Sequence, residues 1–256
     1  MFYRCLYERR YTSVDLTNAY SGTPVFIIGG NPSLKTLPLD RLESSRLPTL
    51  ALNNALYVYP NPTMWLTADR PLCYGGHFFA RPDITKFAYM NYRDEVVQAT
   101  GRALKDHPMM LFYTASEGEI TSGFFEDKPA FTWCKSVFPL ALQLAWRAGA
   151  RRVYLVGCSF LTNGQVPYAW GARLTPPQVT WSQLTYDDDI NRLRRLRPIF
   201  DAHGFEIVSC TPNSRANEIF PLVDLASAIA VELARLPQPT PVSELIHSSE
   251  TRLPGL

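Results

Sequence analysis

Short apolar runs that end in glycine or in polar residues recur along the chain. The first run, residues 25–28, is β-branched and too short for a buried helix, so it predicts a central strand. Further strands are predicted within residues 49–54, 64–69, 86–91, 109–113, 152–157 and 205–210. Strands at this spacing, with connecting segments between them, predict an α/β fold with a mainly parallel sheet flanked by helices.

Helical periodicity is clearest in residues 136–148, where the apolar positions fall on one face and Gly149 is expected to end the helix. Residues 187–203 predict a second helix, whose acidic start would suit the helix dipole. A third helix is expected from about residue 218 to 236, and a short helix or irregular crossover at 37–47. Residues 114–132 and 160–186 show no helix signal, and the second segment is long enough to form a lid.

The ends of the chain differ in character from its centre. Residues 1–23 are polar and aromatic and are expected to form a leading arm or an edge element. Residues 237–256 are rich in proline and serine, which predicts a mobile tail. We therefore expect one α/β nucleotide-binding domain over residues 1–236, with a lid at about 160–186.

The turn after the first strand is the first candidate for ligand binding. Gly29 and Gly30 let the backbone approach a ligand closely, Asn31 and Ser33 are good helix N-cap residues, and Pro32 suits a first helical position. A strand, a glycine turn and a helix N-terminus would direct backbone N–H groups at a phosphate or another anion. A tight turn without a ligand explains the same residues equally well.

Polar residues and glycines also follow the other predicted strands. Ligands of open parallel sheets bind beyond the carboxyl ends of the strands. The residues expected at such ends are Gly29 to Ser33, Asn53, Asn54, Asp69, Gly157, Ser159 and Asn213. Glycines and small polar side chains suit the phosphate and sugar of a nucleotide, so the sequence predicts nucleotide binding at this edge.

Composition limits the partners and the cellular location that we expect for the protein. A formal net charge of +2 over 256 residues gives no general nucleic-acid patch. The five cysteines show neither zinc-ligand spacing nor a disulfide framework, which favours a reducing, cytoplasmic setting. The first residues do not read as a signal peptide, and no segment approaches the length of a membrane span.

The C-terminal half resembles a known family. The family-42 bacterial sialyltransferases resemble this chain at residues 153–160 (Val-Tyr-Leu-Val-Gly-Cys-Ser-Phe), Asn163-Gly164, Tyr168-Ala169, the acidic helix start Asp-Asp-Ile at 188–190 and the Thr-Pro-Asn-Ser at 211–214. The Gly-Gly-Asn-Pro-Ser-Leu of residues 29–34 resembles their Gly-Asn-Gly-Pro-Ser-Leu nucleotide loop. The same loop occurs in the related group that includes archaeal 6-hydroxymethylpterin pyrophosphokinases. The order and spacing match over roughly residues 24–222.

This resemblance implies a Rossmann-like domain with a lid, a CMP-sugar donor and metal-independent glycosyl transfer without a cofactor. It also implies a bacterial or bacteriophage source and a possible homo-oligomer. Carried over by position, the nucleotide-binding residues are Gly29, Gly30, Asn31, Pro32, Ser33, Asn53, Asp69, Ser136 and Gly157. Ser159 stands where the family has an aspartate, and we count it with this set.

The catalytic positions match the family only in part. Tyr168 matches one of two lid tyrosines that bind the donor phosphate, but the other falls on Leu161 and the family's histidine base falls near Leu184. Candidate substitutes are His77, Tyr186, Asp187 and Asp188, and Lys135 or Arg151 could pair with phosphate. A surface-loop histidine and a charge cluster at a helix N-terminus are the simpler interpretations of His77 and of residues 187–189.

Three functions therefore stay open. The first is a nucleotide-sugar-dependent glycosyltransferase with Tyr168 on the donor phosphate. The second is a pyrophosphokinase-like enzyme that uses ATP and Mg²⁺, with the acids at 187–189 as metal ligands. The third is a nucleotide-binding protein without catalytic activity.

Overall fold

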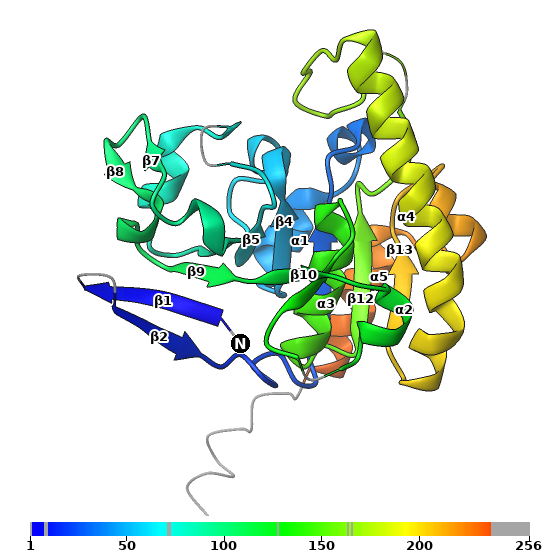
Figure 1. The fold of residues 1–256 in the computed structure, drawn as a ribbon. Coiled ribbons are helices and arrows are strands. Elements are labelled where there is room, and N and C mark those ends of the chain that lie inside the picture. Colours follow the sequence, from blue (N-terminus) through cyan, green and yellow to red (C-terminus); the bar gives the residue numbers. More distant parts are fainter. Residues whose placement is uncertain are drawn as a thin grey trace, which may run out of the picture.

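The computed structural model describes residues 2–7, 10–70, 73–126, 128–162, 164 and 166–236. A nine-stranded sheet forms its centre (Figure 1). In spatial order the strands are β13 (Glu206–Ser209), β12 (Arg152–Val156), β3 (Val25–Ile28), β4 (Thr49–Leu52), β5 (Met64–Leu66), β6 (Thr85–Tyr89), β9 (Met110–Tyr113), β1 (Phe2–Tyr7) and β2 (Arg10–Val14). The first seven are parallel, and β1 and β2 add an antiparallel hairpin at the edge. The predicted mainly parallel α/β sheet is confirmed.

The direction in which strands are added reverses at β3. From β3 the chain builds β4, β5, β6 and β9 outwards on one side, and it then returns to place β12 and β13 on the other side. Strands β3 and β12 pair in parallel, with Ile28 opposite Val156. The carboxyl ends of these two strands therefore form a topological switch point, which is where open α/β sheets place their ligands.

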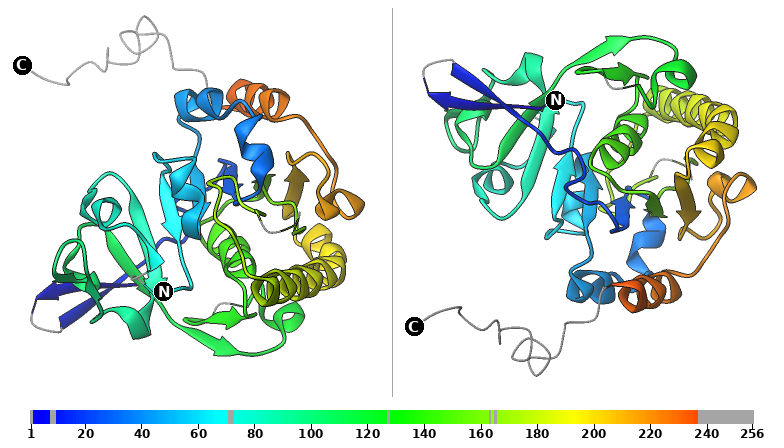
Figure 2. Two further views of the ribbon diagram at one scale, coloured as in Figure 1. Left: turned by 90° about the horizontal axis from the view of Figure 1, so that it is seen from above. Right: turned by 90° about the horizontal axis from the view of Figure 1, so that it is seen from below.

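Two helical layers cover the sheet. The helices α3 (Val137–Arg147) and α4 (Pro176–Ala202) pack on one face, and α1 (Leu39–Ser45) and α5 (Leu225–Arg235) pack on the other (Figure 2). Successive residues of β3 alternate between these layers, because side chains along a strand point to opposite faces. Val25 and Ile27 join the core beneath α3 and α4, whereas Phe26 and Ile28 join the core beneath α1 and α5.

Smaller elements surround the sheet. A parallel pair is formed by β10 (Ala115–Glu117) and β11 (Phe131–Trp133), and an antiparallel pair by β7 (Val96–Val97) and β8 (Arg102–Ala103). Short helical segments are α2 (Ile120–Gly123) and the 3₁₀ turns η1 (Pro32–Lys35), η2 (Asn53–Tyr57), η4 (Gly76–Ala80), η5 (Met90–Tyr92), η6 (Leu104–Asp106) and η7 (Arg215–Glu218). No helix within the described ranges has both the length and the apolarity to cross a bilayer.

The predicted loop at 114–132 was wrong, because it contains β10, α2 and the start of β11. The buried amide of Gln143, on α3, fixes this segment. Its oxygen accepts from the N–H of Thr132 at 2.9 Å, and its nitrogen donates to the carbonyl of Thr132 at 3.0 Å. This contact between distant residues leaves no periodic pattern in the local sequence.

The predicted start of the long helix was also wrong. Helix α4 begins at Pro176, so the second part of the expected lid is helical. Thr175 and Gln178 form a capping box and Pro176 takes the first turn, which are ordinary start signals that the loop prediction overlooked. The acids at 187–189 consequently lie in the middle of the helix, where the expected interaction with its dipole does not arise.

The last helix begins later than expected, at Leu225, after a side-chain cap by Asp224. The expected tail at 237–256 lies outside the described residues, as does Asn163 of the family-like sequence.

Candidate functional site

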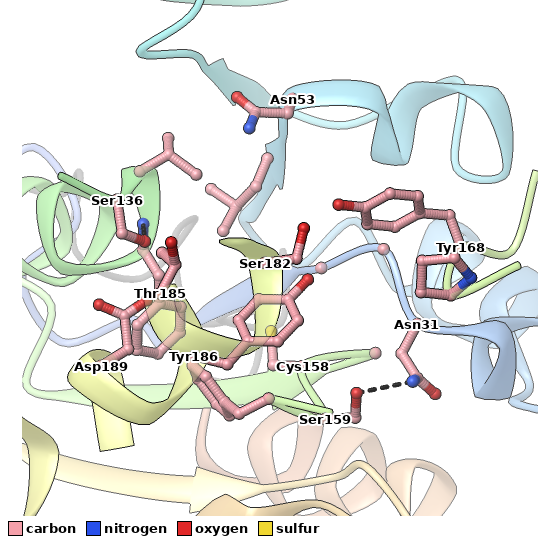
Figure 3. Close-up of a pocket in the computed structure, with 18 of the residues that line it drawn as sticks. Asn31, Asn53, Ser136, Cys158, Ser159, Tyr168, Ser182, Thr185, Tyr186 and Asp189 are labelled. Atoms are coloured by element: carbon pink, nitrogen blue, oxygen red, sulfur yellow. Dashed lines mark hydrogen bonds between the residues drawn. The ribbon is translucent and has the colours of Figure 1, made fainter. Parts of the chain in front are cut away.

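A pocket of about 380 Å³ opens at the switch point between the carboxyl ends of β3 and β12. Its walls come from the turn after β3, the ends of β4 and β5, the junction of β11 and α3, the segment after β12, and α4 (Figure 3). The predicted nucleotide-binding and catalytic residues that line it are Gly29, Gly30, Asn31, Asn53, Asp69, Ser136, Gly157, Ser159 and Tyr168, and the further candidates Lys135 and Tyr186 line it as well. Pro32, Ser33 and His77 are not part of this lining.

The glycines are required by close packing. A Cβ atom on Gly29 would lie 2.4 Å from the carbonyl oxygen of Gly157, and one on Gly30 would lie 2.7 Å from the ring of Trp170. Both distances are too short for a side chain. Gly29 therefore lets the turns after β3 and β12 touch, and Gly30 lets the aromatic segment after β12 close against the turn.

The amide groups of this turn do not converge on a ligand as predicted. The N–H of Gly29 donates to Val156 at 2.8 Å, and that of Asn31 to the carbonyl of Gly157 at 2.9 Å. The N–H of Ser33 donates to Asn31 Oδ1 at 2.9 Å, which makes Asn31 the cap and Pro32 the first residue of a four-residue 3₁₀ turn. Because these three donors are used within the protein, and the turn is not an α-helix, the expected anion site at a helix N-terminus is not formed by them.

Asn31 and Ser159 instead hold the two sides of the switch point together. Asn31 Nδ2 donates to Ser159 Oγ at 2.6 Å, across the pocket floor (Figure 3). The same amide caps the 3₁₀ turn through its oxygen, so its orientation is fixed by both contacts. The family-like aspartate position, here serine, thus serves the internal architecture of the pocket.

Asn53 and Asp69 belong to a network of hydroxyl groups at the ends of β4 and β5. The hydroxyls of Thr67 and Tyr74 each lie 3.1 Å from Asn53 Oδ1, and the hydroxyl of Tyr74 also lies 3.1 Å from Asp69 Oδ2. Burial raises the pKa of Tyr74 far above its usual range, so it stays a neutral donor. With its oxygen occupied, Asn53 turns its amide nitrogen towards the pocket (Figure 3).

An aromatic wall closes the pocket opposite the sheet. The ring of Tyr168 stacks on Trp170 with centroids 4.6 Å apart and planes at 6°. The N–H of Ala169, between them, donates to the carbonyl of Gly30 at 2.9 Å and fastens this segment to the glycine turn. The side chain of Tyr186, on α4, lies near Tyr168, and burial raises the pKa of Tyr186 well above its ordinary value. Tyr168 and Tyr186 therefore line the same cavity.

Asp189 is a pocket residue that the sequence analysis considered only as one of three possible metal ligands at 187–189. Its side chain is 1% exposed, yet it lines the pocket from α4. Arg192 Nη1 lies 3.1 Å from Asp189 Oδ1, and Ser136 lies beside this carboxyl group in the pocket lining (Figure 3). Burial raises the pKa of Asp189 to about 7, although Ser136 and Arg192 act in the opposite direction.

The sequence indicates that Asp189 is buried once the predicted helix is extended towards its N-terminus, to Pro176. Asp189 falls beside Ile190 and one turn before Leu193, on the face of α4 that enters the core. An acid on the apolar face of a helix must be buried or must bind something. The wrong helix start hid this pattern, because it placed residues 187–189 at an exposed terminus.

The other proposed substitutes lie elsewhere. His77 lines a neighbouring, mainly apolar cavity of about 320 Å³. Asp187 forms an ion pair with Arg215, and Asp188 is exposed beside Arg192. Leu184 is exposed on α4, whereas Leu161 lines the pocket without a polar group.

The three adjacent acids at 187–189 do not form one site. Asp187 pairs with Arg215, Asp188 is exposed beside Arg192, and Asp189 is buried at the pocket. Among the described residues, no group of three or more histidine, cysteine, aspartate or glutamate side chains is placed to hold a metal ion.

Comparisons with known proteins complete the description. No family model matches the chain, and no curated protein matches its sequence. Among solved structures, the chain is similar to the sialyltransferase CstII from Campylobacter jejuni in complex with a substrate analogue, CMP-3FNeuAc. The identity is 15% and the TM-score 0.41, with 78% of this chain and 86% of that chain covered. Similarity of this degree leaves the functional argument to the pocket.

Proposed function

We propose that the protein is a glycosyltransferase that binds a nucleotide sugar, with a CMP-sugar as donor, in the pocket at the switch point. The observation that carries this proposal is that Tyr168, Tyr186, the glycine turn and the polar strand ends all line one cavity. A nucleotide-sized ligand in that cavity would meet hydrogen-bond donors at one end and flat aromatic surface at its rim.

In this arrangement the nucleoside lies against Gly29, Gly30 and the free amide nitrogen of Asn53. The phosphate of the donor then lies between the hydroxyls of Tyr168 and Tyr186, which donate to the oxygen that gains charge as the glycosidic bond breaks. Tyr186 would thereby supply the hydroxyl that is missing at Leu161. Lys135 also lines the pocket and places a cation at its rim.

The alternative of a pyrophosphokinase-like enzyme draws less support from the site. That reaction would use the acids at 187–189 as a shared Mg²⁺ site, but Asp187 pairs with Arg215, whereas the exposed Asp188 and the buried Asp189 pair with Arg192. A nucleotide-binding protein without catalysis would keep the same glycine turn and the same polar strand ends. Ligand binding with and without metal, together with turnover, separates the three functions.

The direct test is thermal unfolding in the presence of CMP, CDP, UDP, GDP or ATP, each with and without Mg²⁺. We expect CMP to raise the midpoint in the absence of metal, because a ligand at about 100 times its Kd stabilises the folded state by about 2.7 kcal/mol. A shift that requires both ATP and Mg²⁺ would favour the pyrophosphokinase-like function. No shift with any nucleotide at millimolar concentration would overturn both enzyme proposals.

We also propose that the protein has a single domain, forms a homo-oligomer and resides in the cytoplasm. A single domain over residues 1–236 and a homo-oligomer are both open to measurement by limited proteolysis and light scattering. A cytoplasmic setting agrees with the free thiols of Cys73, Cys134, Cys158 and Cys210, the cysteines whose side chains are described.

A further inference from the structure

The carboxyl group of Asp189 is buried in the lining of the pocket, where it pairs with Arg192 of the same helix. It lies on the core-facing side of α4, where its neighbours Ile190 and Leu193 are buried apolar residues. Burying a carboxyl group costs free energy, and such groups are retained where they bind or react. Its position in the lining of the nucleotide pocket gives it access to a bound substrate.

The position of Asp189 within the pocket is specific. Figure 3 shows Asp189 grouped with Ser136 and Thr185 on the side of the pocket away from Tyr168 and Asn31. Tyr168 and the glycine turn, which we assign to the donor nucleotide, therefore lie on one side, and the buried acid lies on the other. A sugar held between them would have its leaving phosphate near the tyrosines and its opposite face near Asp189.

Resting on the proposed transferase function, we propose that Asp189 is the general base that takes the proton from the acceptor hydroxyl. The acceptor oxygen forms a bond to the anomeric carbon of the donor sugar, and its proton passes to the carboxylate of Asp189. The bond between the anomeric carbon and the phosphate oxygen breaks, and its electron pair leaves with the nucleoside monophosphate. Tyr168 and Tyr186 donate hydrogen bonds to that leaving phosphate.

Ser136 and Arg192 position this base. Ser136 accepts a hydrogen bond from the N–H of Phe138 at 3.2 Å as the cap of α3, which fixes its hydroxyl beside Asp189. Arg192 Nη1 lies 3.1 Å from Asp189 Oδ1 and holds one oxygen of the carboxylate. These contacts orient the carboxylate while the pocket side stays available to substrate.

The charge environment of Asp189 comes from two elements. On α4, Arg192 favours its charged form, whereas Asp188 opposes it and Tyr186 lies nearby. From the junction of β11 and α3, Cys134 and Lys135 lie near the same region. Burial outweighs the favourable contacts and raises the pKa of Asp189 to about 7, which suits a base that works near neutral pH.

The test follows the release of CMP from CMP-sialic acid by the full chain, with water as acceptor, between pH 5 and 9. For the wild-type protein we expect kcat/KM to rise with pH and to level off above about 7, as Asp189 ionises. Asp189→Asn should lower the rate by about 10²–10⁴-fold, the usual worth of a general base, and should remove this rise. CMP binding, measured by calorimetry, should change less than about threefold, because the base does not contact the nucleotide.

Two further variants keep the test decisive. Asp188→Asn removes the adjacent, exposed carboxylate that contacts the same Arg192. It should leave the plateau rate above pH 7 unchanged and keep the rise with pH, moved only to slightly lower pH because Asp188 opposes the charged form of Asp189. Asp189→Ala should recover part of the lost rate when formate is added, because a small carboxylate can enter the space and accept the proton. If Asp189→Asn fails to fold, the Asp189→Ala protein with and without formate gives the same answer.

Stability separates a catalytic from a structural acid. The pKa of Asp189 is raised in the folded state, so the folded protein binds this proton more tightly than the unfolded chain, and stability is lost as pH rises from about 4 through 7. Asp189→Asn removes that loss, and its melting temperature should exceed that of the wild type at pH 8 by more than at pH 5. A structural carboxylate would instead give a less stable variant at pH 8.

The outcomes are distinct for the base and for the transferase. A wild-type protein that turns over the donor while Asp189→Asn retains more than a tenth of the rate overturns the role of Asp189 alone. A wild-type protein that releases no CMP at any pH overturns both the base and the transferase activity. In that case, CMP binding measured by calorimetry shows whether the pocket binds a nucleotide.

Discussion

At the scale of single residues, the pocket depends on side chains whose partners fix their direction. Asn31 caps a turn with its oxygen and binds Ser159 with its nitrogen, and Asn53 accepts from two hydroxyls with its oxygen alone. The oxygen and the nitrogen of the first amide both bond within the protein, whereas the second bonds through its oxygen and keeps its nitrogen for a ligand. Both asparagines were predicted to bind the nucleotide, but their hydrogen bonds give them different roles. Asn31 joins two parts of the protein, and Asn53 can donate to a ligand.

The hydroxyl of Tyr168 gives the first prediction at this scale. Tyr168→Phe keeps the ring that stacks on Trp170 and removes only the donor. If that hydroxyl stabilises the leaving phosphate, kcat for CMP release should fall by about 10²-fold or more, as for the loss of one donor to a developing anion. Steady-state kinetics with CMP-sialic acid measure this. Tyr92→Phe, outside the pocket lining, is the control, and an unchanged rate for Tyr168→Phe would remove Tyr168 from the mechanism.

At the scale of elements, the predictions succeeded where a local pattern decides the structure. The seven parallel strands and the helix α3 have apolar runs or apolar faces that mark them in the sequence. The polar strand ends at Gly29, Asn53, Asp69 and Gly157 also predicted correctly which positions meet, because parallel strands share one carboxyl edge. The start of α4 was missed although Thr175 and Gln178 form a capping box, since proline and glycine nearby suggested a loop.

Other parts of the site depend on contacts between distant residues. Strand β11 is held by the buried amide of Gln143, and Tyr186 reaches Tyr168 only because α4 starts early enough to pass the pocket. His77, a candidate substitute for the missing catalytic groups, lines a different cavity. The spacing of residues along the chain does not show which neighbour or cavity a side chain will reach.

The contact between α3 and β11 supports the second prediction. Gln143→Leu would leave both the N–H and the carbonyl of Thr132 buried without this partner, which should destabilise the fold by about 2–4 kcal/mol. Because β11 leads directly into Trp133, Lys135 and Ser136 at the pocket, CMP binding should weaken as well. Urea unfolding and calorimetry measure the two effects. Gln98→Leu, at an exposed position, should change stability by less than about 0.5 kcal/mol.

At the scale of the whole molecule, function and stability lie at opposite ends of the sheet. The pocket occupies the carboxyl ends of the strands, beside Gly29 and Gly157. At the amino end of β12, Glu232 of α5 is buried and binds Arg152 at 2.8 Å and the hydroxyl of Tyr154 at 2.6 Å. This network ties the last helix to the sheet and contributes no group to the pocket lining.

This separation gives the last prediction. Glu232→Gln removes the charge that partners Arg152 and Arg235, and breaking a buried ion pair from one side should lower the free energy of unfolding by about 3 kcal/mol. Glu206→Gln breaks the exposed pair with the same Arg152 and should cost less than about 1 kcal/mol, because water screens that contact. Both proteins should bind CMP with the wild-type Kd at a temperature where they are folded. Weaker binding by Glu232→Gln alone, measured well below its melting temperature, would mean that α5 and the pocket are coupled through β12, and it would contradict the separation of the two ends.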